Sequence, residues 1–367
     1  MQKEALDIME KIKVLVLFGG QSSEHEISEL SVTNVLKNMD DRLEVYAVGI
    51  TKEGKWFLYE GDYDKIKGCA WEKSDKLTPA ILSPDATMGG LIVFGKDGST
   101  RLIDIDVVYP ALHGKFGEDG TIQGLCQLAG LPCVGPDMIS SAICMDKVVA
   151  KIYFKELGIP QADWVTATDY EISENIDKVV SRIEAKLDYP VFVKPSNAGS
   201  SVGIGKAKTR EDLKESLINA AKHDSKILIE EFIKGREIEC AALGNREVIV
   251  AEPGEVISCK EFYDFEAKYE AESKIQIPAD IAPELLKEVK TQAEKLFRGI
   301  GLSGLSRLDF FVTEDKKVYI NEINTLPGFT DISMYPKMME NIGIPQNELV
   351  FRLVCCAIDK FSGCENE

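Results

Sequence analysis

Two predicted strands, SRLDFFV and VYINEIN, carry the clearest candidates for chemistry. If the hairpin that joins them is centred on Asp315 and Lys316, Asp309 lies directly opposite Glu322. Two carboxylates at that separation repel each other unless a cation lies between them. Asn324, two residues beyond Glu322, adds an oxygen ligand on the same face, and Mg²⁺ prefers oxygen ligands. The pattern therefore predicts a magnesium site.

The same register sets Arg307 opposite Asn324, so four polar side chains share one face. The alternative is a solvated hairpin face with two unrelated acids, because a turn of odd length would shift the register. The three histidines cannot build a histidine-rich metal centre, and the nine scattered cysteines contain no CxxC pair. Oxygen ligands, and hence Mg²⁺ or Mn²⁺, are therefore favoured.

A glycine-rich segment, YPVFVKPSNAGSSVGIGK, is the second candidate. A buried strand delivers Lys194, and the loop that follows contains Ser200, Ser201 and several glycines. Small residues let backbone N–H groups and hydroxyls close around phosphate oxygens, and the lysine adds a positive charge. The spacing does not match the GxxxxGK[ST] pattern, which disfavours P-loop folds. A loop of this composition can be an ordinary turn, but after an apolar strand that ends in lysine it indicates phosphate binding.

Two further segments suit a nucleotide site. The strand ILIEEFIKGREIE ends in acids that could accept hydrogen bonds from adenine or ribose, although Glu230, Glu231 and Glu237 could equally be exposed charges at a strand end. Residues 260–274 form a long loop with aromatic rings, which we interpret as a lid that excludes water, with a surface loop as the alternative. Residues 324–337 predict a rigid turn that presents backbone N–H groups to an anion.

The elements that position these residues indicate an α/β (α+β) chain. A strand that ends in Gly19-Gly20, followed by a helix and more strands, predicts an N-terminal domain with a Rossmann-like parallel sheet. After Gly135-Pro136, one helix is expected from about Ser140 to Leu157, and strands and helices then alternate. The predicted domains are residues 1–135, residues 136–230 with the phosphate loop, and residues 231–367 with the metal site and lid.

The formal net charge of −18 excludes some classes of partner. Nucleic acids and membrane surfaces are anionic and would repel this chain, so we expect small molecules or other proteins as partners. No apolar run approaches the length of a membrane helix, and the charged first residues do not resemble a signal peptide. We therefore expect a cytoplasmic protein whose cysteines are reduced and mostly fill the core.

Taken together, these segments resemble the D-alanine–D-alanine ligase family, a branch of the ATP-grasp enzymes. Several motifs in one order are far more specific than any single motif. The resemblance covers nearly the whole chain and implies a three-domain ATP-grasp fold, ATP as co-substrate and a homodimer. The motifs that carry it are FGGQSSEHEIS, ALHGKFGEDGTIQG, MDK, KPSNAGSSVG, FYDFEAKY, SRLDF and NEINTLPGFT.

The resemblance also assigns the nucleotide and metal residues. It implies that ATP phosphates are bound by Lys147, Lys194, Ser201 and, from the lid, Lys268. Adenosine would be surrounded by Glu230, Phe232, Ile233, Glu237 and Phe311. Two Mg²⁺ ions, or Mn²⁺ in their place, would be bound by Asp309, Glu322 and Asn324, in agreement with the hairpin argument.

For the substrates, the resemblance implies two subsites. Glu24 would bind the ammonium of the first D-alanine, with support from Ser200 and Tyr269 and with His113 nearby. The oxyanion hole would consist of Arg307 and the backbone N–H of Gly328. The carboxylate of the second D-alanine would be bound by Ser333 and the backbone at Met334.

The implied reaction forms D-alanyl-D-alanine for peptidoglycan precursors through a D-alanyl phosphate. The intact Lys268-Tyr269 pair and the apolar Met334 favour D-alanine as the acceptor, and the alternatives are D-serine and D-lactate. An oxidoreductase is disfavoured because no GxGxxG follows Gly19-Gly20. A non-catalytic nucleotide-binding scaffold would not need to retain Arg307 together with the three metal ligands.

Overall fold

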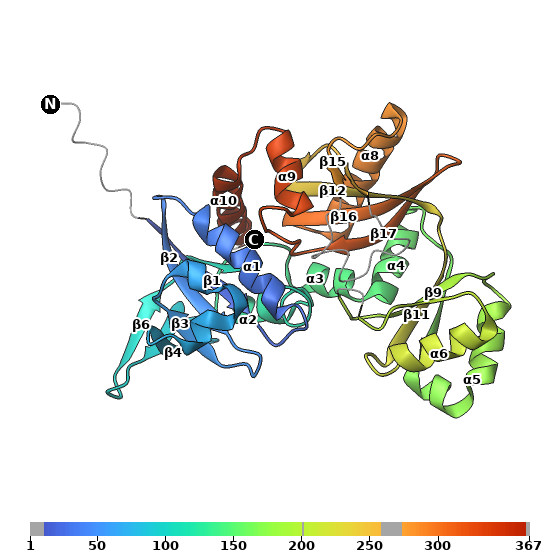
Figure 1. Cartoon of the computed structure of the whole chain (residues 1–367). Helices are drawn as coiled ribbons and strands as arrows, with labels where there is room; N and C mark the ends of the chain where they lie inside the picture. The colour runs from blue at the N-terminus through green and yellow to red at the C-terminus, as the bar shows by residue number, and fades with distance from the viewer. Residues whose placement is uncertain (1–10, 200–201, 258–273, 365–367) are drawn as a thin grey trace.

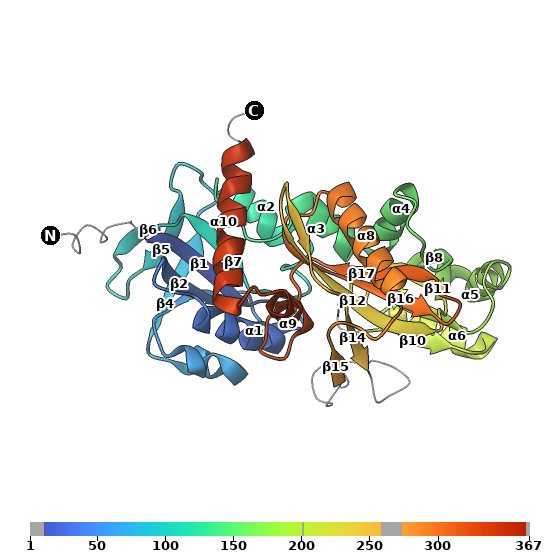
Figure 2. The same ribbon diagram turned by 90° about the horizontal axis from the view of Figure 1, so that it is seen from above.

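The computed structural model describes residues 11–199, 202–257 and 274–364 of the chain. Three separate sheets follow one another along the sequence. In space their order differs, because the C-terminal sheet lies between the other two (Figures 1 and 2). The C-terminal sheet can therefore contact both neighbours.

The N-terminal sheet has seven strands in the order β6-β5-β4-β3-β2-β1-β7. Only β2, β1 and β7 run parallel, so the expected parallel arrangement is confined to one side of a mixed sheet. Helices α1, α2 and the short 3-10 helices η1 and η2 accompany it. The bounds are β1 Ile12–Gly19, α1 His25–Lys37, β2 Leu43–Ile50, β3 Trp56–Tyr59, η1 Tyr63–Lys65, η2 Lys67–Lys73, β4 Leu77–Leu82, β5 Gly90–Phe94, β6 Thr100–Asp104, β7 Val107–Pro110 and α2 Thr121–Leu128.

The single helix expected from Ser140 to Leu157 is wrong. The structure has two helices, α3 (Met138–Met145) and α4 (Lys147–Glu156), which are separated at Asp146. Asp146 has an extended backbone, with ψ of 99°, and its side chain caps α4 by accepting the N–H of Val148 and Val149. The cap starts a new helix whose first residue is Lys147.

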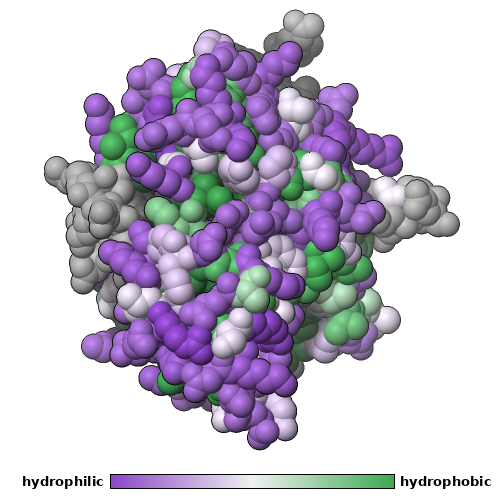
Figure 3. All heavy atoms as spheres, turned by 90° about the vertical axis from the view of Figure 1, so that its right-hand side faces the viewer, coloured by the Kyte–Doolittle hydropathy of each residue, from purple (hydrophilic) through white to green (hydrophobic). Residues whose placement is uncertain are grey.

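The central sheet has four strands in the order β10-β9-β11-β8. Two helices cover it, and each begins with a capping box, at Thr168 for α5 and Thr209 for α6. Figure 3 views the molecule from this side and shows mainly hydrophilic side chains with scattered apolar ones. The bounds are β8 Trp164–Thr168, α5 Asp169–Glu184, β9 Val191–Pro195, β10 Gly205–Ala207, α6 Arg210–Ala220 and β11 Lys226–Glu231.

The C-terminal sheet has the order β15-β14-β12-β16-β17, with β13 also paired to β12. The predicted hairpin is β16 and β17, and α8 packs along this sheet. The bounds are β12 Gly235–Gly244, β13 Val248–Val250, β14 Gly254–Ile257, β15 Lys274–Gln276, α8 Pro283–Ile300, β16 Gly304–Thr313, β17 Val318–Asn324, α9 Met334–Asn341 and α10 Gln346–Cys364.

The closing helix α10 lies between the N-terminal and C-terminal sheets (Figure 2). Its buried residues Leu349 and Leu353 share one apolar core with Val14 of β1 and Leu305 of β16. This shared core fixes the N-terminal sheet relative to the predicted metal hairpin. Among the residues described, no helix is both long and apolar enough to cross a membrane.

Candidate active site

The hairpin of β16 and β17 brings the predicted acids together. Asp309 pairs with Glu322 and Arg307 pairs with Asn324, which confirms the predicted register at these positions. Arg307 donates to both carboxylate oxygens of Asp309, each at 2.8 Å, and Asn324 Nδ2 donates to Asp309 Oδ2 at 2.8 Å. The side chains therefore form one polar group on one face of the sheet.

The register nearer the turn was predicted wrongly. Val312 pairs with Val318, one residue away from the pairing that a turn centred on Asp315 and Lys316 requires. The turn is odd in length, and Lys316 takes a left-handed conformation with φ of 63°. A bulge at Asn321 then compensates, because it inserts one unpaired residue before Glu322.

Glu239 adds a third acid to this face. It pairs with Asp309 on the other side of β16, and its Oε2 lies 3.0 Å from Arg307 Nε. Arg307 is thus bound between two carboxylates. Burial would lower the pKa of Arg307, but Asp309 and Glu239 raise it well above its ordinary value. Arg307 therefore supplies a permanent positive charge beside the acid pair.

A second charged group connects the central and C-terminal sheets. Glu230 on β11 is 4% exposed, and its two oxygens contact Lys194 Nζ at 2.6 Å and Lys151 Nζ at 2.5 Å. Burial would raise the pKa of Glu230, but the two lysines lower it to about 2. Lys194 Nζ also lies 3.4 Å from Asn321 Oδ1, so the bulged strand reaches the lysine.

Lys147 approaches the same place from α4. Its Nζ donates to the backbone oxygen of Ala198 at 2.8 Å and lies 3.8 Å from Glu322 Oε2. Ala198 belongs to the glycine-rich loop, so Lys147 joins that loop to the acid pair. The structure therefore brings Lys147, Lys194 and the hairpin acids into one site with several positive and negative charges.

The residues predicted to surround adenosine lie beside this charged group. Phe311 is two residues after Asp309 on β16 and pairs with Glu237 of β12. Phe232, just after β11, has its ring 3.9 Å from Lys206 Nζ, and Ile233 follows it in a half-buried position. These residues come from both sheets, as a nucleotide site between them would require.

Glu24 precedes α1 and is 8% exposed. Its Oε2 occupies space that a side chain would need at two glycines. A Cβ atom would lie 2.3 Å from it at Gly114 and 2.5 Å from it at Gly199. Gly199 belongs to the glycine-rich loop, so the loop and the predicted ammonium-binding residue are in contact.

His113 is buried near Glu24 and links the loop after β7 to the turn after β17. Its Nδ1 donates to the backbone oxygen of Leu326 at 3.0 Å, and its Nε2 lies 2.7 Å from Ser31 Oγ. Burial lowers the pKa of His113, so the ring is neutral and Nε2 accepts from the serine hydroxyl. His113 therefore connects α1 with the turn after β17.

Glu118 joins the same two loops. Its carboxylate accepts the N–H of Gly114 at 2.8 Å and that of Leu326 at 3.1 Å. Burial and the nearby Glu24 raise the pKa of Glu118 to about 7. A group that titrates near neutral pH thus lies at the contact between the N-terminal domain and the predicted oxyanion loop.

The predicted second-carboxylate residues lie together at the start of α9. Ser333 immediately precedes the helix, and its Oγ accepts the N–H of Thr330 at 3.0 Å. A Cβ atom at Gly328 would lie 3.1 Å from Ser333 Oγ, so the two residues are neighbours. Met334 is 5% exposed and packs against Gly254. Free backbone N–H groups at a helix start attract anions.

Some predicted residues cannot be placed. The residues outside the described part of the chain are Ser200, Ser201, Lys268 and Tyr269. The predicted lid, residues 260–274, also lies outside it, except for Lys274, the first residue of β15.

Sequence reasoning missed four residues of the site, namely Lys151, Glu118, Glu239 and Asn321. Lys151 is four residues after Lys147 on one helix, and this spacing sets both on the same side. Glu239 is two residues after Glu237, so strand alternation could have assigned it to the same face. The contacts of Glu118 and Asn321 depend on long-range packing and on a bulge, which no local pattern reveals.

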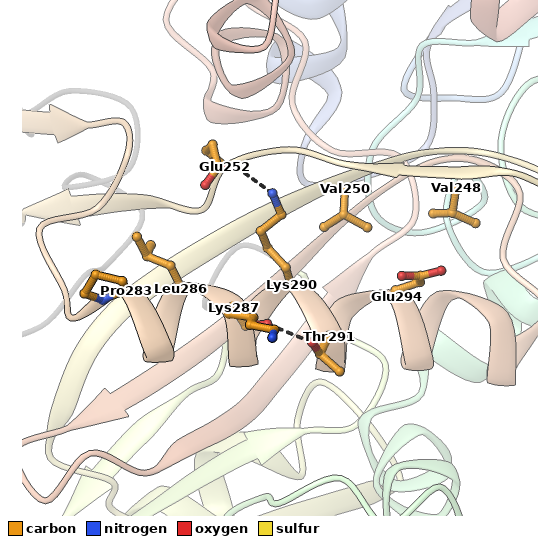
Figure 4. Close-up of a pocket in the computed structure, with 9 residues that line it drawn as sticks. All are labelled: Val248, Val250, Glu252, Pro283, Leu286, Lys287, Lys290, Thr291 and Glu294. Atoms are coloured by element: carbon orange, nitrogen blue, oxygen red, sulfur yellow. Dashed lines mark hydrogen bonds and ion pairs between the residues drawn. The ribbon is translucent and has the colours of Figure 1, made fainter.

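A groove of about 520 Å³ lies elsewhere, between α8 and β13 (Figure 4). Lys290 and Glu252 face each other there at 2.5 Å, beside the apolar side chains of Val248, Val250 and Leu286. None of the site residues described above lines this groove. It is therefore separate from the candidate active site.

Comparison with known proteins agrees with the geometry. Residues 13–136 match the family model described as "D-ala D-ala ligase N-terminus", and residues 153–355 match "D-ala D-ala ligase C-terminus". The chain belongs to the D-alanine–D-alanine ligase family. The two family models together span both the Glu24 segment and the hairpin of β16 and β17, so the ligase match includes every described part of the candidate site except Lys147 and Lys151.

Individual ligases of this family are similar over nearly their whole length. The chain is 50% identical to the D-alanine–D-alanine ligase of Acetivibrio thermocellus, with 96% of this chain and 97% of the relative covered. For the ligase of Caldicellulosiruptor bescii the identity is 50%, with 96% of each chain covered.

Solved structures of ligases share the fold. The VanG D-Ala:D-Ser ligase of Enterococcus faecalis has a TM-score of 0.86 and 38% identity, with 95% of this chain and 100% of that chain covered. The D-alanine–D-alanine ligase of Coxiella burnetii has a TM-score of 0.83 and 33% identity, with 97% and 98% covered. The predicted ATP-grasp ligase fold is confirmed.

Proposed function

We propose that this protein joins two D-alanine molecules into D-alanyl-D-alanine for peptidoglycan precursors, while ATP is converted to ADP and phosphate. The observation that carries the proposal is the pairing of Asp309 with Glu322 beside Lys147 and Lys194. Opposed acids next to lysines suit a metal-bound polyphosphate, because each group compensates charge on the others. The high identity to proteins named D-alanine–D-alanine ligase supports the same reaction.

We propose that Asp309, Glu322 and Asn324 bind two Mg²⁺ ions, or Mn²⁺ in their place. The donor set fits, because two carboxylates and one amide oxygen project from adjacent strands. The Asn324 amide donates to Asp309, and rotation of that amide would present its oxygen instead. When bound, the ions would neutralise phosphate oxygens.

In the first step, the carboxylate of one D-alanine attacks the γ-phosphorus of ATP. The bond from that phosphorus to the β,γ-bridging oxygen breaks, which gives D-alanyl phosphate and ADP. Two anions must approach each other for this attack. Lys147 and Lys194 would hold the phosphate oxygens and reduce the repulsion, while Glu24 would orient the substrate through its ammonium group.

In the second step, the amine of another D-alanine attacks the acyl carbon, and phosphate leaves as the amine loses a proton. Arg307 and the N–H of Gly328 would stabilise the tetrahedral oxyanion, a contribution of about 3 kcal/mol for one well-placed donor. Ser333 and the backbone at Met334 would bind the carboxylate of this acceptor at the start of α9.

D-Serine is the second candidate acceptor, because a solved ligase with 38% identity is named for D-serine. The apolar Met334, which is 5% exposed, offers no hydrogen bond to a hydroxyl and therefore favours D-alanine. D-Lactate is the third candidate acceptor. The domain boundaries after residues 135 and 230, the homodimer and the cytoplasmic location also remain predictions.

The reaction is tested with purified protein, ATP, Mg²⁺ and D-alanine, by measuring phosphate and dipeptide together. We expect one phosphate for each dipeptide formed. Phosphate release without dipeptide would contradict the ligase proposal. With D-serine or D-lactate in competition, a predominantly mixed product would contradict only the choice of D-alanine as acceptor.

A further inference from the structure

A cluster of metal-ligating side chains lies outside the proposed active site, where α1 packs against η2. His25, Glu29 and Cys69 each offer one ligand atom, and these atoms lie within 4.8 Å of one another. His25 and Glu29 are buried, and Cys69 is half-buried. Sequence patterns did not reveal the cluster, because Glu29 and Cys69 are 40 residues apart.

The backbone fixes which nitrogen of the neutral His25 ring carries the proton. Its Nδ1 lies 2.8 Å from the carbonyl oxygen of Gly20, so Nδ1 carries a proton and donates it. When Nε2 carries no proton, its lone pair is directed toward the cluster. Histidine ligands of metals characteristically donate their other ring N–H to a backbone carbonyl in this way.

The distances around Nε2 suit a shared cation. It lies 3.5 Å from Glu29 Oε1 and 3.8 Å from Glu72 Oε1, and it has no hydrogen-bond partner among the described residues. A normal N–H···O bond is shorter, about 2.7–3.2 Å. Two tetrahedral ligands about 2.0–2.2 Å from one zinc ion lie roughly 3.3–3.6 Å apart.

The other two ligands are held in place by their surroundings. Glu29 accepts the N–H of Cys69 at 2.9 Å and the indole N–H of Trp71 at 2.8 Å, which fixes its carboxylate. Cys69 has φ of 57°, a left-handed conformation that is unfavourable for a residue with a side chain. The local chain thus takes a strained conformation that keeps the thiol beside Glu29.

We propose that His25 Nε2, Glu29 and Cys69 bind a zinc-class divalent cation, with a water molecule as the fourth ligand. Nitrogen, oxygen and sulfur ligands together select Zn²⁺ over Mg²⁺. Binding releases the thiol proton of Cys69 to solvent, and the thiolate forms the bond to the metal. The ion connects η2 to α1, the helix that begins directly after Glu24.

Cobalt spectroscopy tests the site in chelator-treated, full-length protein saturated with Mg²⁺ and ADP. Co²⁺ replaces Zn²⁺, and a cobalt–thiolate bond absorbs strongly in the near ultraviolet, whereas oxygen ligands do not. We expect this absorption to saturate at one equivalent and to disappear when Zn²⁺ is added. Cys69→Ser should remove it, and the matched control Cys355→Ser, on α10, should retain it.

Absence of the absorption in the wild-type protein would overturn the proposal, whatever the variants do. Its persistence in Cys69→Ser would overturn it as well, because another thiol would then bind the metal. Thermal unfolding provides a second readout. Zn²⁺ should raise the Tm of the wild type and of Cys355→Ser but not of Cys69→Ser, and equal shifts in all three would contradict the site.

Discussion

Asp309 pairs with Glu322 across β16 and β17, although the turn between these strands sets a register one residue away. The bulge at Asn321 makes up the difference. Without it, strand alternation would direct Glu322 to the core face, together with the buried Val318 and Ile320. The acid pair on which the proposed metal site depends therefore requires one additional residue in β17.

Replacing Glu322 by Gln should abolish most turnover and leave the fold intact. The neutral amide keeps the shape of the side chain but removes the charge that binds a divalent cation, so we expect kcat to fall at least about 100-fold. Glu314→Gln, an exposed position in the same hairpin, is the matched control and should behave like wild type. Near-normal activity of Glu322→Gln would remove this residue from the metal site.

The hairpin shows what local sequence can predict. A turn centred on Asp315 and Lys316 was sufficient to predict Asp309 opposite Glu322, because the bulge at Asn321 restores that register at the site. The prediction failed near the turn, because turn length and the bulge at Asn321 each shift the pairing by one residue and the two shifts cancel only at the site.

Replacing Glu230 by Gln should destabilise the protein strongly. Lys151 and Lys194 would lose the carboxylate between them and remain buried with unbalanced charge. Loss of one member of such a buried group costs about 3–5 kcal/mol in the free energy of unfolding, which denaturant titration measures. The neighbouring half-buried Glu231→Gln should cost clearly less. Equal losses for the two variants would contradict this role of Glu230.

Glu118 should make stability depend on pH. Its pKa is raised from an ordinary 4.5 to about 7, so its stabilising contribution is complete below pH 4.5 and is lost as the pH rises through 7. The loss amounts to about 3 kcal/mol. Glu118→Gln should flatten this part of the pH profile of unfolding, and exposed Glu60→Gln should not. An unchanged profile in Glu118→Gln would assign the dependence to other groups.

Gly199→Ala should weaken binding of the first D-alanine. The new Cβ would lie 2.5 Å from Glu24 Oε2, so the carboxylate would have to move away from the substrate ammonium. We expect the KM for D-alanine to rise about tenfold, equivalent to about 1.4 kcal/mol, and more than the KM for ATP. Gly363→Ala, in more open surroundings on α10, is the control. An unchanged KM for D-alanine would separate the loop from the substrate subsite.

Motifs and long-range contacts differed in how well they could be predicted. The residues that lie within short motifs, such as Lys147 and Lys194, were predicted because their neighbours in sequence identify them. The contacts of Glu118 could not be predicted, because they join Gly114 to Leu326, which is far away in the sequence. The helix break at Asp146 was also missed, because the apolar pattern continues through it and only the capping hydrogen bonds of Asp146 start α4 as a separate helix.

The central claim is that the opposed acids bind the metal that holds the nucleotide. Calorimetric titration of the wild-type protein with ADP, in the presence and in the absence of Mg²⁺, tests it most directly. We predict tight ADP binding with Mg²⁺ and at least about tenfold weaker binding without it. Equal ADP affinity in the two titrations would contradict the account.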